Sequence, residues 1–187
     1  MADPLQERTF RLLRDYLEYC AREPGTPGLP PSTPEAAVLR SAAAQLQRQH
    51  QPFFSLYRGY QGNRVELMAR MTEAVFSDSQ GLNWGRVVTL VTFAGTLLER
   101  GPQDTARGQK RDKVALDCQR LVALLCAQLV GRHRAWLEAR GGWDGFCLFF
   151  RTPLPLTFWR RLLVQIFMSL LLTTAFLCLW KQFYRKF

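Results

Sequence analysis

An arginine stands at the start of a strongly apolar segment of the 187-residue chain. The stretch reads Asn83-Trp84-Gly85-Arg86 and is followed by twelve uncharged residues that end at Leu98. Asn83 is a typical N-cap residue, so a cation at Arg86 would lie in the first turn of a helix and oppose its dipole by roughly 0.3–1 kcal/mol. Arg86 beside unpaired backbone N–H groups suits a ligand carboxylate, and Gly85 lets a second helix backbone approach. The alternative interpretation is a surface arginine without a ligand.

Few residues in the chain could catalyse a reaction or hold a metal. The two histidines, His50 and His133, stand far apart, without clustered carboxylates or a glycine-rich phosphate loop. We therefore expect no enzyme and no cofactor. The five cysteines are scattered without a CxxC pair, which argues against a zinc site or a disulfide scaffold and favours a reducing, cytosol-facing location.

The net charge of +10 alone would allow nucleic acid or an acidic membrane as a partner. Four cations gather at 107–113, but an aspartate lies among them and no aromatic residue does. A nucleic-acid site of this kind normally offers aromatic rings on which bases stack. We therefore interpret residues 101–113 as a solvated basic loop and expect no nucleic-acid partner.

Helical periodicity runs through residues 1–158, which we interpret as one cytosolic domain. Apolar spacing predicts an amphipathic helix over about 5–22, followed by a proline-rich linker over 23–33. Thr33 as N-cap and a proline at the first helical position predict a second helix that runs to about Pro52. Further helices are predicted over about 63–76, where Asn63 and Glu66 resemble a capping box, and over 84–98, 114–130, 132–140 and 143–150.

The segment 84–98 differs from the other predicted helices because it lacks a polar face. Only Arg86 is charged between Trp84 and Leu98. Such a helix must be covered by protein on all sides, so we expect it to be the centre of the fold. No alternation typical of strands is present, and the predicted domain is all-helical.

A second cluster, Trp136–Phe146, joins the last two predicted helices. Its Gly141-Gly142 break ends one helix, and Asp144 favours the positive N-terminal end of the next. Taken alone, this pattern indicates a helix corner.

Leu162–Trp180 contains 19 residues without a charge. As a helix it would be about 28 Å long, which matches a hydrocarbon core of ~30 Å. The flanking cations that can reach the membrane interface are Arg160, Arg161 and Lys181. Because only seven residues follow this segment, we expect insertion after synthesis and a tail anchor over 159–187. A buried core helix is the alternative, but such helices are normally shorter and carry a polar stripe.

Together, these features closely resemble the Bcl (B-cell lymphoma) family of apoptosis regulators. Asn83–Arg86 is similar to the first homology motif of the family, Gly141–Phe146 to the second and Leu12–Tyr19 to the fourth. Two further segments, Ala21–Pro27 and Val87–Gly101, are most similar to one branch of the family. The resemblance spans nearly the whole chain. It implies a helical bundle around a buried apolar central helix, followed by a transmembrane helix.

The resemblance implies a hydrophobic groove that receives an amphipathic helix from another protein. Motif alignment pairs Arg86 with an aspartate of the ligand helix and places Asn83 and Gly85 beside it. The remaining groove residues that the alignment implies are Leu46, His50, Phe53, Phe54, Tyr57, Met71, Val75, Val88, Thr89, Phe93 and Phe150.

The implied partners are pro-apoptotic family members, either Bax/Bak-like or ligand-only proteins, and a lipid bilayer. The bilayer would be the mitochondrial outer membrane, the endoplasmic reticulum membrane or both, with the domain facing the cytosol. A cytosolic pool and homo- or heterodimers are compatible with the same resemblance.

One motif departs from the family pattern. The death-ligand helix normally reads Leu-x-x-x-Gly-Asp, but the matching residues here are Leu39, Ala43 and Ala44. The chain therefore suits the role of a receptor for such helices, which indicates an anti-apoptotic function. The alternative is a pro-apoptotic or pore-forming member, because 84–98 and 114–130 form an apolar hairpin like that of pore-forming toxins.

Overall fold

The structure is a computed structural model and describes residues 3–23, 26, 28–76, 81–99 and 109–151. All regular elements in this part of the chain are helical, so the predicted all-α bundle is confirmed. The elements are α1 (Pro4–Cys20), α2 (Pro34–Gln49), α3 (Gln51–Tyr57), α4 (Arg64–Phe76), α5 (Trp84–Leu98), α6 (Gln109–Cys126), a π-helical segment (Ala127–Arg132), α7 (Arg134–Ala139) and α8 (Gly142–Arg151). The predicted anchor over 159–187, its flanks Arg160, Arg161 and Lys181, and the boundary after residue 158 lie outside the described residues.

Side-chain caps begin two helices where the sequence predicts them. Thr33 Oγ1 accepts a hydrogen bond from the backbone N–H of Ala36 at 3.2 Å, at the start of α2. Asn63 Oδ1 accepts one from the N–H of Glu66 at 3.1 Å, at the start of α4. Each cap satisfies a backbone donor that the first turn of a helix leaves unpaired.

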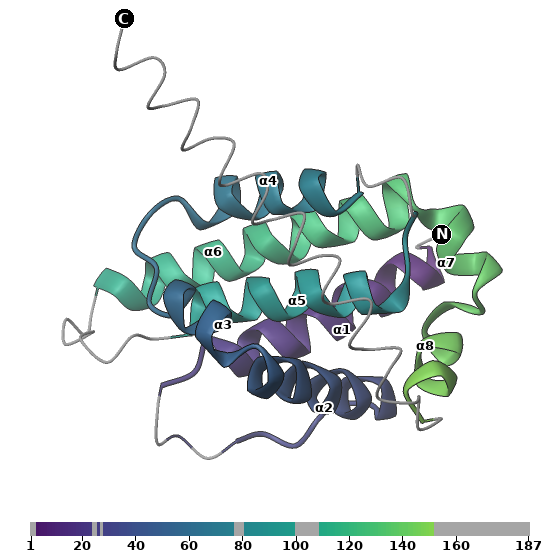
Figure 1. Ribbon diagram of the computed structural model, residues 1–187, viewed down its shortest axis with the longest axis horizontal. Helices are drawn as coiled ribbons and strands as arrows, with labels where there is room; N and C mark the ends of the chain where they lie inside the picture. Colours follow the sequence, from purple (N-terminus) through teal and green to yellow (C-terminus); the bar gives the residue numbers. More distant parts are fainter. Residues whose placement is uncertain (1–2, 24–25, 27, 77–80, 100–108, 152–187) are drawn as a thin grey trace, which may run out of the picture. The chain divides into compact units, whose positions relative to one another are not determined.

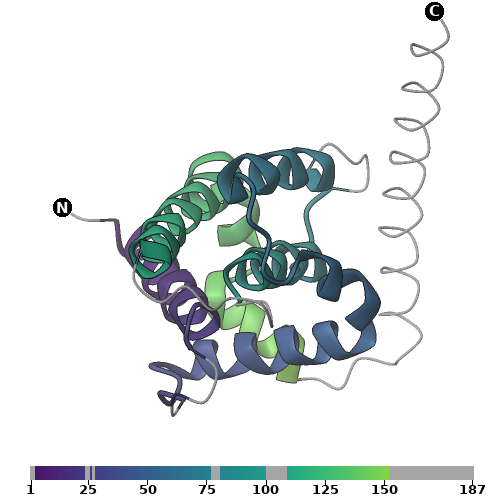
Figure 2. The same ribbon diagram turned by 90° about the vertical axis from the view of Figure 1, so that its left-hand side faces the viewer.

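Helix α5 is buried along its whole length. All 15 residues from Trp84 to Leu98 are buried, and Leu90 retains 1% of its exposure. The helix packs against α1, α2, α3, α4 and α6, and Figures 1 and 2 show it in the middle of these helices. The expectation that 84–98 is the centre of the fold is therefore confirmed.

The second predicted helix is broken where the sequence predicts continuity. Helix α2 ends at Gln49, His50 takes non-helical angles (φ −121°, ψ 33°), and α3 begins at Gln51. Pro52 lacks a backbone N–H, so a continuous helix would lose a hydrogen bond at that residue. A new helix accepts proline in its first turn without this loss, which explains the break.

The predicted basic loop over 101–113 is too long at its C-terminal end. Helix α6 already begins at Gln109, and Asp112 lies in its first turn. An acidic residue there interacts favourably with the helix dipole. The helix thus starts within the polar stretch, where Asp112 and Lys113 are exposed, and residues 100–108 lie outside the described part.

Among the described residues, one helical stretch has the length and composition of a membrane span. It runs over 21 residues from Asp112 to Arg132, and its most apolar 18-residue window has a mean hydropathy of 1.5 and is 44% buried. Helix α6, which makes up most of it, packs against α1 and α4. Core helices of soluble bundles share these properties.

A buried ion pair connects α4, α5 and α6. Arg64 Nη1 donates to Asp117 Oδ2 at 2.8 Å, and Arg64 Nε donates to the carbonyl of Leu97 at 2.8 Å. Both charged residues are nearly covered, with 6% and 7% of their surface exposed. The pair holds α4 in place, and α4 carries one wall of the predicted groove.

We predict that Leu90→Asp unfolds the domain, because an unpaired buried charge costs several kcal/mol. The matched control is Leu56→Asp, since Leu56 is 78% exposed on α3 and Leu90 is 1% exposed on α5. Thermal melting followed by circular dichroism measures both variants. An unchanged melting curve for Leu90→Asp would contradict the burial of α5.

Candidate ligand-helix binding site

The first turn of α5 is organised by Asn83, as predicted. Its Oδ1 accepts a hydrogen bond from the backbone N–H of Arg86 at 2.9 Å. Gly85 is buried beside it, and its carbonyl accepts a hydrogen bond from Thr89 Oγ1 at 2.9 Å. Asn83, Gly85, Arg86 and Thr89 therefore belong to the hydrogen-bonded first two turns of α5.

The Arg86 guanidinium reaches the end of α4. Its Nη1 donates to the carbonyl of Gly81 at 2.5 Å and lies 3.4 Å from the carbonyl of Val75, in the last turn of α4. The carbonyls at a helix C-terminus carry partial negative charge and favour a cation. Arg86 opposes the dipole of its own helix but complements that of α4, which explains its place in the sequence.

Arg86 is also more buried than a surface receptor would be. Only 4% of its surface is exposed. A ligand carboxylate would therefore have to join or replace carbonyl partners from the same chain. The pairing of Arg86 with a ligand aspartate remains a prediction.

Four predicted groove residues form an aromatic group between α3 and α5. Phe53 lies 5.2 Å from Phe54, 5.3 Å from Tyr57 and 6.1 Å from Phe93, measured between ring centroids. Tyr57 and Phe93 meet edge to face at 5.0 Å. Contacts of this geometry stabilise more than the burial of their area alone, so the group holds α3 against α5.

The predicted groove residues divide into two sets by exposure. The partly exposed set can meet a ligand as the helices stand and consists of His50, Phe53, Tyr57, Met71 and Phe150. The buried set consists of Leu46, Phe54, Val75, Val88, Thr89 and Phe93. Members of the buried set would touch a ligand only after α3 or α4 moves away from α5.

His50 is partly buried, and this burial disfavours its charged form. Burial lowers the pKa of His50 below its ordinary value. The ring is therefore neutral at pH 7 and suits an apolar ligand face better than a cation would. Within the described residues, no group of three His, Cys, Asp or Glu side chains could hold a metal ion.

Phe150 belongs to a second aromatic group at the start of α5. Its ring centroid is 4.8 Å from Phe146, which lies 5.4 Å from Trp84. Trp84 also contacts Trp136 at 4.8 Å and Trp143 at 5.9 Å. The sequence pattern of Trp136–Phe146 predicts a helix corner but not this aromatic group. The spacing of its aromatic residues is the one signal in the sequence that points to the group.

The family model of apoptosis regulator proteins of the Bcl-2 family matches residues 39–143. The chain belongs to the Bcl-2 family of apoptosis regulators. It is 67% identical to Bcl-2-like protein 10 of Homo sapiens, over 97% of this chain and 94% of that protein. It is 39% identical to the anti-apoptotic protein NR13 of Coturnix japonica, over 80% of each chain. The branch indicated by Ala21–Pro27 and Val87–Gly101 is that of Bcl-2-like protein 10 (Bcl-B), and this prediction is confirmed.

Two solved structures support the same fold for this Bcl-2 family member. The solution structure of a divergent Bcl-2 protein is 50% identical, with a TM-score of 0.68, and covers 82% of this chain and 94% of that one. The crystal structure of the zebrafish pro-survival protein NRZ in its complex with the Bad BH3 is 28% identical, with a TM-score of 0.63, and covers 78% and 94% of the two chains.

We predict that Arg86→Ala destabilises the domain by about 1–3 kcal/mol, because buried carbonyls lose their donor. The matched control is Arg70→Ala, since Arg70 is exposed on α4 and pairs with Glu66 one turn away, a type of surface pair worth about 0–1 kcal/mol. Urea denaturation of both variants measures the difference. Equal losses would show that the contacts of Arg86 with α4 carry no special weight.

Proposed function

We propose that this Bcl-2 family member is an anti-apoptotic receptor for the amphipathic BH3 helices of pro-apoptotic family members. One observation carries the proposal: a buried arginine in the first turn of α5 stands on the same helix as Phe93, which the partly exposed rings of Phe53 and Tyr57 contact. A BH3 helix offers apolar anchors on one face together with an aspartate. The aromatic group around Phe93 matches the apolar anchors, and Arg86 on the same helix as Phe93 matches the aspartate.

The apolar anchors of the ligand would enter between α3 and α4. His50, Phe53 and Tyr57 would contact them on one side and Met71 on the other. Met71 is flexible and polarizable, so this wall can adapt to several related ligands. Opening of α3 would bring Phe93 into contact, and the ligand aspartate would then bind Arg86.

Two findings support the anti-apoptotic direction. The relative NR13 is named an anti-apoptotic protein, and the structural neighbour NRZ is a pro-survival protein in complex with a BH3. In this chain, Leu39 and Ala43 of α2 are buried, with 0% and 1% of their surface exposed. A helix that keeps these residues in its own core and lacks the Gly-Asp pair is a poor death ligand. Partners would be Bax/Bak-like or ligand-only proteins.

We predict that BH3 peptides of Bad and Bax bind the protein and that Arg86→Ala weakens the tighter peptide about ten- to a hundredfold. This is the effect of losing a charged hydrogen bond of roughly 1.5–3 kcal/mol. The same peptide with its aspartate replaced by alanine separates the ion pair from the structural effect of Arg86 in a double-mutant cycle. Isothermal titration calorimetry measures all four affinities.

The cycle has two informative failures. If Arg86→Ala weakens the unmodified peptide and the aspartate-to-alanine peptide equally, the arginine does not pair with the ligand aspartate. If neither unmodified peptide binds, the proposed receptor function is wrong. Arg70→Ala serves as the control and should leave both affinities unchanged.

A pore-forming, pro-apoptotic role is the second candidate. The observation that favours it is the stretch Asp112–Arg132, which has the length and hydropathy of a membrane span. Helix α5 is the shorter apolar helix beside it. Both helices pack within the domain, and their release would require the loss of the Arg64–Asp117 ion pair.

We further propose that residues 159–187 anchor the protein in the mitochondrial outer membrane, the endoplasmic reticulum membrane or both. The uncharged stretch Leu162–Trp180 and its flanking cations support this proposal. The anchor would hold the receptor where its partners act, and a cytosolic pool would exist before insertion.

We predict that removal of residues 159–187 releases the protein from membranes, because the proposed anchor is lost. Fractionation with carbonate extraction compares the full chain with the truncated one. A truncated protein that stays in the carbonate-resistant pellet would contradict the anchor and would point to Asp112–Arg132 instead.

A further inference from the structure

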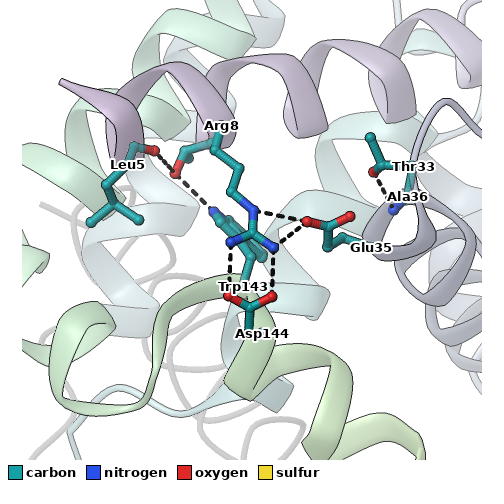
Figure 3. A network of polar contacts seen from close by, with 8 residues as sticks. Leu5, Arg8, Thr33, Glu35, Ala36, Trp143 and Asp144 are labelled. Carbon is teal, nitrogen blue, oxygen red and sulfur yellow. Dashed lines mark hydrogen bonds and ion pairs between the residues drawn. The ribbon is translucent and has the colours of Figure 1, made fainter. Parts of the chain in front are cut away.

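One arginine of α1 joins three helices. Arg8 donates two hydrogen bonds to the carboxylate of Asp144 on α8, from Nη1 to Oδ2 at 2.9 Å and from Nη2 to Oδ1 at 2.8 Å. Its Nε donates to Glu35 Oε1 on α2 at 2.8 Å, and its Nη2 contacts the same oxygen. Figure 3 shows the guanidinium between the two acids, with one edge toward each.

Thr9, which follows Arg8 in α1, contacts Trp143, which precedes Asp144 in α8. Trp143 Nε1 donates to Thr9 Oγ1 at 2.8 Å, and Thr9 Oγ1 in turn donates to the carbonyl of Leu5 at 2.8 Å. The indole is completely buried. Two consecutive residues of α1, Arg8 and Thr9, therefore hold the first turn of α8.

The backbone at the start of α8 leaves no room for a side chain at Gly145. A Cβ at Gly145 would lie 1.8 Å from the carbonyl oxygen of Arg140, so this corner admits only glycine without moving. The first turn of α8 is thus closely packed, and Arg8 and Thr9 contact this turn. Helices α2 and α8 also pack against each other, and they carry the predicted groove residues Leu46 and Phe150.

We propose that Arg8 is a positioning residue for the ligand-helix groove, which it acts on by fixing α8 against α2. The inference rests on the proposed receptor function. Arg8 touches neither the aromatic group of α3 and α5 nor Arg86 in the described contacts. It acts on ligand binding through the two helices that it joins.

The charge of Arg8 explains how this arginine joins α2 and α8. Glu35 and Asp144 both lie against one cation, and hydrogen bonds from Arg8 hold the pKa of Asp144 below its ordinary value. The pKa of Glu35 is also below its ordinary value, because the effect of its burial is outweighed by hydrogen bonds to its carboxylate, so both acids are charged at pH 7. Without Arg8, Glu35 on α2 and Asp144 on α8 would lose the cation that they share, and the hydrogen bonds that join the two helices through α1 would be lost.

The contacts of Arg8 with Glu35 and Asp144 affect the orientation of α8 more than the stability of the domain. Exposed ion pairs contribute little to stability, and the Asp144 side chain is 76% exposed. Two-edged binding by a guanidinium nevertheless restricts geometry strongly. The buried Trp143 keeps α8 attached when Arg8 is replaced, so the main effect falls on the orientation of α8.

The test compares Arg8→Gln with Arg11→Gln in the full chain in detergent micelles. Arg11 lies one turn further along α1 and pairs with Glu7 of the same helix. We expect Arg8→Gln to weaken the Bad or Bax BH3 peptide about three- to tenfold, mainly through faster dissociation, because a preorganised groove loses less order on binding. Arg11→Gln should bind as the wild type does.

Two further measurements distinguish a positioning role of Arg8 from a merely structural one. Asp144→Asn should weaken binding similarly, and the double variant with Arg8→Gln should add little to either single change. Hydrogen exchange of the α8 amides and the Trp143 indole should quicken in Arg8→Gln at a temperature where the domain remains folded.

The outcomes distinguish this inference from the proposed function. Wild-type peptide binding with unchanged affinity in Arg8→Gln overturns the positioning role and leaves the receptor function intact. Equal losses in Arg8→Gln and Arg11→Gln also overturn it, because they reflect general charge. Absence of binding by the wild type overturns both.

Discussion

The whole structure depends on the burial of α5, a helix with no face that can meet water. All 15 of its residues are buried, so α1, α2, α3, α4 and α6 must surround it. A helix of this kind has no stable state apart from its neighbours. The helices that cover α5 on one side are also those proposed to open for a ligand, which links ligand binding directly to the exposure of the core.

Arg86 shows how one residue can serve both the fold and the proposed binding site. Its charge is unfavourable at the start of α5, but its guanidinium lies against the carbonyls at the end of α4. The residue thereby connects the central helix to α4, which carries one wall of the predicted groove. A ligand carboxylate at this position would compete with contacts that already hold α4, so binding and a small movement of α4 would be coupled.

Much of the fold could be predicted from local sequence patterns, but the contacts between residues distant in the sequence could not. Thr33 and Asn83 cap helices through bonds to residues three positions ahead, and such bonds are visible in a sequence. The family resemblance supplied the groove residues, and the structure brings Phe53, Phe54, Tyr57 and Phe93 together. The break at His50 was missed because Pro52 opens a new helix instead of ending the predicted one, and the early start of α6 was missed because polar composition does not fix helix ends. The roles of Arg8 and Trp143 depend on partners more than 100 residues away.

The most direct test of the central claim is the effect of the full chain on cytochrome c release from mitochondria. Cells that express the protein would receive a death stimulus, and cytosolic cytochrome c would be measured against cells without it. A receptor that occupies BH3 helices predicts less release. An increase in release would contradict the anti-apoptotic account and favour membrane permeabilisation by α5 and α6.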